Sequence, residues 1–148
     1  MKITKLDIYI LRAPDTGRPH WVSNFIVPRA NEILVRMHTD EGVEGIGIAT
    51  SYTPIEAAIK AFRSGIADLV IGADPLAPER LYQNIFALTS QRIASEKGWS
   101  REAIVRISAA MDIAAWDIVG PIKGSVPFYN DNGTYPFISL LTGCGKAG

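Results

Sequence analysis

The chain of 148 residues has little of what marks several classes of protein. Cys144 is its one cysteine, which excludes a disulfide within the chain. Lys and Arg form no run and the formal net charge is zero, so the sequence predicts no basic surface for binding nucleic acid. The apolar runs are too short to span a bilayer, and the opening MKITKLDIYIL lacks the apolar block of a signal peptide. We therefore expect a single globular domain in the cytoplasm that binds neither nucleic acid nor membrane.

Motifs for metal or phosphate chemistry are also absent. Asp112 and Asp117 lie five positions apart on a predicted helix, about 140° around its axis, and do not converge on one ion. We expect each to have a structural role, as a cap or as the partner of Arg or a backbone N–H. His38 is predicted to be exposed beside Arg36 on the polar face of its strand. These residues predict no catalytic group, no metal ligand and no cofactor site.

Period-two patterns predict three strands, at residues 2–12, 31–39 and 43–50. A short turn ending at Gly42 joins the last two, which favours an antiparallel meander. In the third strand one face is nearly bare, because it carries only Gly45, Gly47 and Ala49. A bare face permits close approach by another backbone or by a ligand. Leu6, Ile8 and Ile10 share one face of the first strand, and Ile33, Val35 and Met37 are expected to point inward from the second.

The rest of the ordered pattern is helical. Thr53 and Pro54 suit the start of a helix that ends near Gly72, a second helix begins at residues 74–78, and Ser100 caps a third. Strands followed by helices predict an α+β domain: a three-stranded antiparallel meander and then a bundle of three or four helices.

The third helix, Ala103 to Gly120, is apolar on nearly every side. Its first stripe consists of Ile104, Ile107, Met111, Ala114, Ala115 and Ile118, and the opposite side carries Ala109, Ala110, Ile113 and Trp116. A helix of this kind has to be covered on both faces. The second apolar face therefore has to be covered by another element, and the sequence contains no segment that is recognisable as this element.

Two polar segments are candidates for binding. The loop of residues 13–30 is too long for a simple connection and carries aromatic, hydroxyl and amide groups. Its alternative role is to fold back so that Trp21 covers the core. The end of the third strand places hydroxyl groups at the start of a helix. The alternative role of these hydroxyl groups is to cap the helix without binding a ligand. The candidate residues are His20, Trp21, Ser23, Asn24, Thr50, Ser51 and Tyr52.

Residues 1–120 resemble the N-terminal capping domain of the enolase superfamily, in its mandelate racemase/muconate lactonizing branch. The resemblance rests on the opening strand KITKLDIYIL, on the hairpin ILVRMHTDEGVEGIGIATSYTP and above all on AAMDIAAWDIVG. The sequence is also similar to acid-sugar dehydratases of that branch. It departs from the family after Gly120, where Pro121 replaces the usual Lys. Residues 121–148 form an atypical Gly- and Pro-rich tail, and we predict no structure for them.

The resemblance implies a cap that closes over a (β/α) barrel. The barrel carries two bases and three carboxylates that hold magnesium, which stabilises an enolate formed next to a substrate carboxylate. The cap supplies two loops that select the substrate, and these match residues 20–25 and 50–52 here. Since no barrel follows, no catalytic residue can be assigned. We expect the lone chain to be inactive and to hold no cofactor, with magnesium belonging to the full-length family.

Two alternatives remain open. The chain is one half of a split enzyme that a separate barrel chain completes, or it is a non-enzymatic module that self-associates. In each case the partner, a barrel domain or a second copy, is expected on the face of helix 103–118. A small carboxylate substrate is expected only where a barrel is present.

Overall fold

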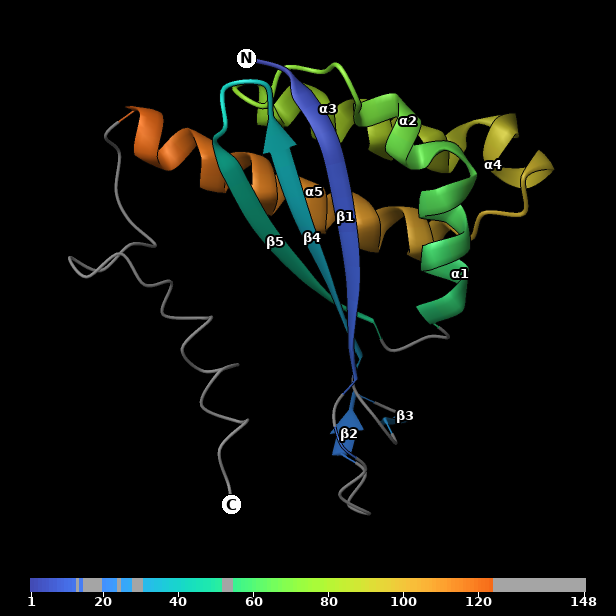
Figure 1. Cartoon of the computed structure of the whole chain (residues 1–148). Coiled ribbons are helices and arrows are strands. Elements are labelled where there is room, and N and C mark those ends of the chain that lie inside the picture. Colours follow the sequence, from blue (N-terminus) through green and yellow to red (C-terminus); the bar gives the residue numbers. More distant parts are fainter. Residues whose placement is uncertain (13, 15–19, 24, 28–30, 52–54, 124–148) are drawn as a thin grey trace, which may run out of the picture.

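A three-stranded antiparallel sheet forms one layer of the structure, which is a computed structural model that describes residues 1–12, 14, 20–23, 25–27, 31–51 and 55–123. The strands β1 (Ile3–Arg12), β4 (Asn31–Thr39) and β5 (Glu44–Ser51) stand in the order β1-β4-β5. Leu6 pairs with Met37 and Val35 pairs with Gly47. The predicted meander is thus confirmed, with β4 at its centre (Figure 1).

The helices lie together on one side of this sheet (Figure 1). They are α1 (Ile55–Ala61), the wide turn η1 (Phe62–Ile66), α2 (Ala67–Val70), α3 (Pro78–Phe86), the 3-10 turn η2 (Ala87–Ser90), α4 (Arg92–Glu96) and α5 (Arg101–Lys123). Ser100 caps α5 as expected, since its Oγ accepts a hydrogen bond of 3.1 Å from the N–H of Ala103. The architecture is the predicted α+β fold of strands followed by a helical layer.

The long helix α5 packs directly on the bare face of β5. A Cβ built on Gly47 would lie 1.8 Å from the carbonyl oxygen of Ala110, and one on Gly45 would lie 2.1 Å from that of Ala114. Helix and strand backbones are therefore in contact with no room for a side chain between them. The sequence predicted that either another backbone or a ligand approaches this face closely. In the structure it is the backbone of α5.

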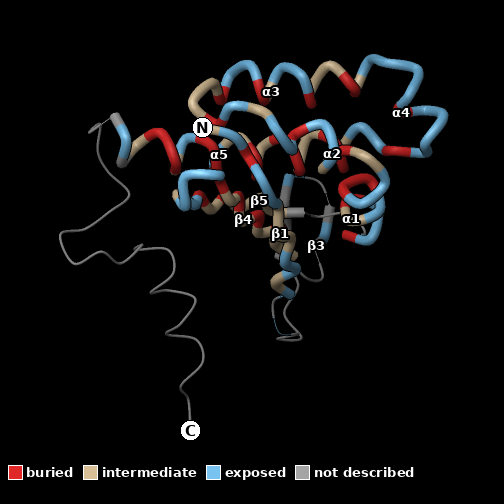
Figure 2. The backbone as a smooth tube through the Cα atoms, turned by 45° about the horizontal axis from the view of Figure 1, so that its top comes forward, coloured by how far each residue is buried: buried red, intermediate tan, exposed pale blue. Residues whose placement is uncertain are grey.

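The core lies between the sheet and α5, and between α5 and the other helices. Ile33, Val35 and Met37 of β4 are fully buried, as their alternation predicted. Ile104, Ile107, Met111 and Ile118 of α5 are fully buried too. Figure 2 shows the exposed residues of α3 and α4 on the outside of the helical layer. Among the described residues, no helix is long and apolar enough to cross a membrane.

Three local features differ from the sequence-based expectations. The segment 13–30, expected to be one loop, contains the short antiparallel pair β2 (His20–Val22) and β3 (Phe25–Val27). The single helix expected up to Gly72 is broken at Gly65, whose φ of 140° is outside helical geometry. Helix α5 continues through Pro121 to Lys123, three residues beyond its predicted end. Thr53 and Pro54, the expected cap of α1, lie outside the described residues.

Candidate functional site

Both segments with candidate binding residues lie at the same end of the sheet. The register pairs Arg12 with Asn31 and Asn31 with Ser51, so the end of β1, the start of β4 and the end of β5 meet there. The hairpin β2–β3 projects beyond this end (Figure 1). The topology therefore places the hairpin at the same end of the sheet as Thr50 and Ser51, although the two segments are far apart in sequence.

Three candidate residues of the hairpin, His20, Trp21 and Ser23, lie in the described part of the chain. His20 pairs with Val27, Trp21 with Ile26 and Val22 with Phe25, which leaves a turn of two residues at the tip. Ser23 begins this turn with a φ of 53° and is exposed. A positive φ at the first turn residue fits the tight turns that match the twist of a hairpin. Asn24, the other turn residue, lies outside the described part of the chain, as does Tyr52.

Thr50 is held by a partner that the sequence analysis missed. Its hydroxyl donates to the carboxylate of Glu32, and both oxygens of that carboxylate lie 3.0 Å away. Glu32 and Thr50 face each other on adjacent strands. Counting outward from the predicted turn at Gly42 pairs these positions, so the sequence held the signal that could have found Glu32. The backbone of Ser51 continues the ladder opposite Asn31.

An ion pair stands next to this pair of residues. Nη2 of Arg12, at the end of β1, lies 3.2 Å from Oε1 of Glu56 on α1. Both side chains are largely exposed, so the pair adds little to stability. What this end of the sheet offers chemically is a set of hydroxyl, carboxylate and guanidinium groups, which suits hydrogen bonding to a polar ligand.

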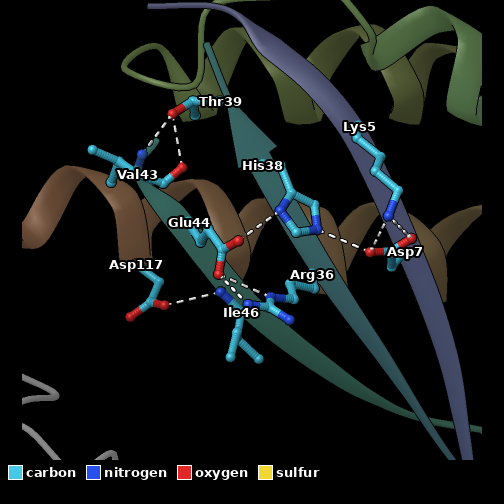
Figure 3. A network of polar contacts seen from close by, with 9 residues as sticks. All are labelled: Lys5, Asp7, Arg36, His38, Thr39, Val43, Glu44, Ile46 and Asp117. Atoms are coloured by element: carbon cyan, nitrogen blue, oxygen red, sulfur yellow. Dashed lines mark hydrogen bonds and ion pairs between the residues drawn. The ribbon is translucent and has the colours of Figure 1, made fainter. Parts of the chain in front are cut away.

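A second polar cluster occupies the outer face of the sheet near the β4–β5 turn (Figure 3). Nε2 of His38 lies 2.9 Å from Oδ2 of Asp7, and Nδ1 lies 2.7 Å from Oε1 of Glu44. The prediction that His38 is exposed was therefore wrong: its side chain is 20% exposed and meets carboxylates on both neighbouring strands. Carboxylates on β1 and β5 supply these partners, which the pattern of a single strand does not reveal.

The charges of this cluster are paired within it. Lys5, followed by His38, lowers the pKa of Asp7 through hydrogen bonds. Arg36, bonded to Glu44, lowers the pKa of that carboxyl, and Glu44 raises the pKa of Arg36. Because each charge already has a partner, the cluster ties three strands together and leaves no free group for chemistry.

The two aspartates of α5 have different surroundings. Oδ2 of Asp117 accepts a hydrogen bond of 2.9 Å from the N–H of Ile46, on the edge strand β5 (Figure 3). This confirms the structural role that was expected for Asp117. Burial, followed by the nearby charge of Glu79, raises the pKa of Asp112. Within the described residues, no group of three His, Cys, Asp or Glu side chains could hold a metal ion.

The family follows from a comparison of sequence profiles. The profile of the mandelate racemase/muconate lactonizing enzyme N-terminal domain matches residues 5–126. The chain belongs to this family. The match covers nearly the whole sheet and the described helices, which lie in the region that resembled the family's cap by its motifs.

Known relatives are much longer than this chain. A D-galactonate dehydratase family member from Pseudarthrobacter chlorophenolicus is 34% identical over 104 residues, which is 69% of this chain and 23% of that protein. An enolase superfamily member from Polaromonas sp. JS666 superimposes with a TM-score of 0.66 at 25% identity, covering 83% of this chain and 31% of that one. A member from Roseovarius nubinhibens, solved with magnesium, gives 0.57 at 23% identity over 82% and 31%. The chain thus spans about a quarter to a third of these relatives.

Proposed function

We propose that this chain is the substrate-selecting cap of a mandelate racemase/muconate lactonizing type of enzyme. One observation carries the proposal: the β2–β3 hairpin and the end of β5 converge at one end of the sheet. There Ser23 is exposed and Thr50 is half-buried, and neither belongs to the apolar core. The similarity to an acid-sugar dehydratase supports a small hydroxylated carboxylate as the substrate class.

The described residues suit selection of a substrate and not its conversion. The Thr50 hydroxyl and the Glu32 carboxylate are fixed against each other at 3.0 Å, so they can discriminate between hydroxyl configurations of a ligand. The described carboxylates do not form a magnesium site. Magnesium, with which a relative was solved, would be held by the C-terminal portion of the family's fold, as would the bases that remove a proton next to the substrate carboxylate.

A chimaera tests the selecting role. In this cap chimaera, residues 1–126 replace the matching N-terminal domain of the Pseudarthrobacter relative. Thr50→Val should change the ratio of kcat/KM between two acid sugars that differ at one hydroxyl by about tenfold, because a lost hydroxyl contact leaves a buried polar group unpaired.

The control is Asp40→Asn, on the turn at the opposite end of the sheet, which should leave the ratio unchanged. An unchanged ratio in the Thr50→Val chimaera, with a normal fold by circular dichroism, would mean that this end of the sheet does not select the substrate.

A second candidate is a self-associating module without enzymatic activity. Ile113 and Trp116, 45% and 47% exposed, favour it because large apolar side chains on one helix face attract a partner. A split enzyme with a separate barrel chain would use the same face. Sedimentation velocity separates the self-associating module from the cap, since only the module requires the isolated chain to form oligomers.

A further inference from the structure

Glu32 and Thr50 belong to one row of side chains across the sheet, at the end from which the β2–β3 hairpin projects (Figure 1). Leu11 of β1 pairs with Glu32 of β4, and Glu32 pairs with Thr50 of β5. Residues two positions apart share a face of a strand, so Leu34 and Ile48 flank this row on the same face. Glu32, Thr50 and both of these apolar neighbours are half-buried. Within the described part of the chain, the hydroxyl of Thr50 is the side-chain donor that reaches the Glu32 carboxylate.

The hydrogen bond between these two side chains has one possible direction. A carboxylate has no hydrogen to donate, so the hydroxyl hydrogen of Thr50 points to Glu32, whose two oxygens both lie 3.0 Å from Oγ1. A threonine hydroxyl has one hydrogen and two lone pairs, so only lone pairs remain for a ligand. Donation to the carboxylate also polarises the hydroxyl, which makes its oxygen a better acceptor. Toward a ligand, the two side chains therefore offer acceptors and no hydrogen.

An arrangement that only accepts hydrogen bonds discriminates between kinds of ligand group. A hydroxyl group of a ligand can donate its hydrogen to Oγ1 of Thr50. A carbonyl oxygen, a carboxylate or a fluorine in the same place would set two acceptors against each other and leave the oxygen of Thr50 without a hydrogen, which costs free energy. The hydrogen-bonding capacity of Glu32 and Thr50 therefore matches a ligand hydroxyl that acts as a donor.

We propose that Glu32 is a positioning residue for substrate selection: it takes the hydrogen of the Thr50 hydroxyl, so that Thr50 accepts a hydrogen bond from a substrate hydroxyl group. The inference rests on the proposed function as a cap. The register supports it, because it holds the two side chains directly opposite each other on neighbouring strands. The flanking residues Leu34 and Ile48 bring no side-chain donor that would compete for the carboxylate.

The first test measures the direction of the hydrogen bond to the ligand. Isothermal titration calorimetry gives the dissociation constants of the cap chimaera for D-galactonate and for analogues in which one hydroxyl far from the carboxylate is replaced by fluorine or by hydrogen. Fluorine keeps the approximate size of a hydroxyl but cannot donate. At one such position both analogues should bind about tenfold more weakly than D-galactonate. Thr50→Ser, which keeps the hydroxyl, should retain this preference, and Thr50→Val should abolish it.

The second test asks whether Glu32 acts through Thr50. The amide of Glu32→Gln can donate to Oγ1, which frees the hydrogen of Thr50, so the preference for hydroxyl over fluorine should fall about fivefold. The same substitution added to the Thr50→Val chimaera should change no ratio. A merely structural role would weaken the binding of all three ligands equally. The matched control is Glu56→Gln, which removes a carboxylate paired with Arg12 at the same end of the sheet and should leave the preference unchanged.

The outcomes separate this inference from the proposed function. If Thr50→Val abolishes the preference but Glu32→Gln leaves it intact, Thr50 contacts the ligand without the help of Glu32, and only the inference fails. An equal effect of Glu32→Gln with and without Thr50→Val would also overturn the inference, because Glu32 would then not act through Thr50. If Thr50→Val leaves every ratio unchanged, this end of the sheet does not select the substrate, and the proposed function fails as well.

Discussion

At the scale of single residues, side chains on neighbouring strands determine whether a charged group is paired within the sheet. His38, Asp7 and Glu44 lie on three different strands and bond to one another, with Lys5 and Arg36 completing the cluster. Thr50 and Glu32 form a smaller pair at the other end of the same sheet. The first group closes on itself and stabilises the sheet, whereas the second faces the segments that we assign to substrate selection.

The cluster predicts a specific dependence of stability on pH. Lys5 and His38 hold the pKa of Asp7 below its usual 3.8, so the folded chain binds this proton less readily than the unfolded chain. The resulting stabilisation is fully present at pH values above the pKa that this carboxyl has in the unfolded chain. It is lost as the pH falls through the lower pKa of the folded chain. Asp7→Asn should therefore make the free energy of unfolding fall less steeply below about pH 4 than in the wild type.

Urea unfolding at a series of pH values between 7 and 3 measures this difference. Asp68→Asn, which removes an exposed carboxylate on α2, serves as the control. Its free energy of unfolding should fall with decreasing pH as steeply as that of the wild type. Parallel curves for Asp7→Asn and the wild type would show that the contacts of Asp7 do not stabilise the folded sheet.

At the scale of elements, the contact between β5 and α5 fixes the position of the long helix. Two glycines of β5 allow the helix backbone to touch the strand, and Asp117 bonds to the N–H of Ile46 on the free edge of that strand. An edge strand with an unpaired N–H is a site for unwanted pairing, so this bond also protects the edge. The face of α5 that remains open is a consequence of this seating.

Gly47→Ala tests the contact. Its Cβ would lie 1.8 Å from the carbonyl oxygen of Ala110, which cannot move without shifting α5. We expect a loss of about 3 kcal/mol or more in the free energy of unfolding, measured by urea titration.

Gly42→Ala is the matched control, since it has a φ of 76° but no atom within 4 Å of the added Cβ. It should cost only about 1 kcal/mol, from backbone conformation alone. Equal losses for the two variants would mean that the close approach of α5 does not contribute beyond the conformational preference of glycine.

At the scale of the whole molecule, the end of the sheet beside the β2–β3 hairpin is the end that we propose for substrate selection, and the described residues contain no group of three side chains that could hold a metal ion. The described polar side chains at that end include Ser23 of the hairpin, Glu32 of β4 and Thr50 of β5. We propose that the chemistry of the family requires the portion of the fold that lies outside this domain.

We expect the purified chain to give no turnover with magnesium and a panel of acid sugars, because our proposal assigns the metal and the bases to the C-terminal portion of the family's fold. Loss of substrate or formation of a 2-keto product, followed by colorimetric assay and by NMR, measures this. The cap chimaera serves as the positive control. Turnover by the purified chain alone would contradict the assignment as a cap.

Much of this structure could be predicted from the sequence because the pattern of apolar and small residues along a strand directly sets which side chains point to each face. Alternation placed Ile33, Val35 and Met37 in the core, and the bare face of β5 predicted a close approach. The β2–β3 pair was missed, since three-residue strands are too short to show alternation and the turn lacks glycine. The break at Gly65 was missed too, because the apolar spacing continues through it and only the packed chain forces a φ of 140° there.

The sequence by itself determined the order of elements, the inward faces and the family, because these depend on side-chain periodicity and on motifs a few residues long. Only the tertiary structure decided which residues meet across strands. It brought Glu32 to Thr50 and two carboxylates to His38, and it left Ile113 and Trp116 of α5 exposed. The physical reason is that register, twist and helix seating are set by packing over the whole domain, and small changes in them alter every contact between distant segments.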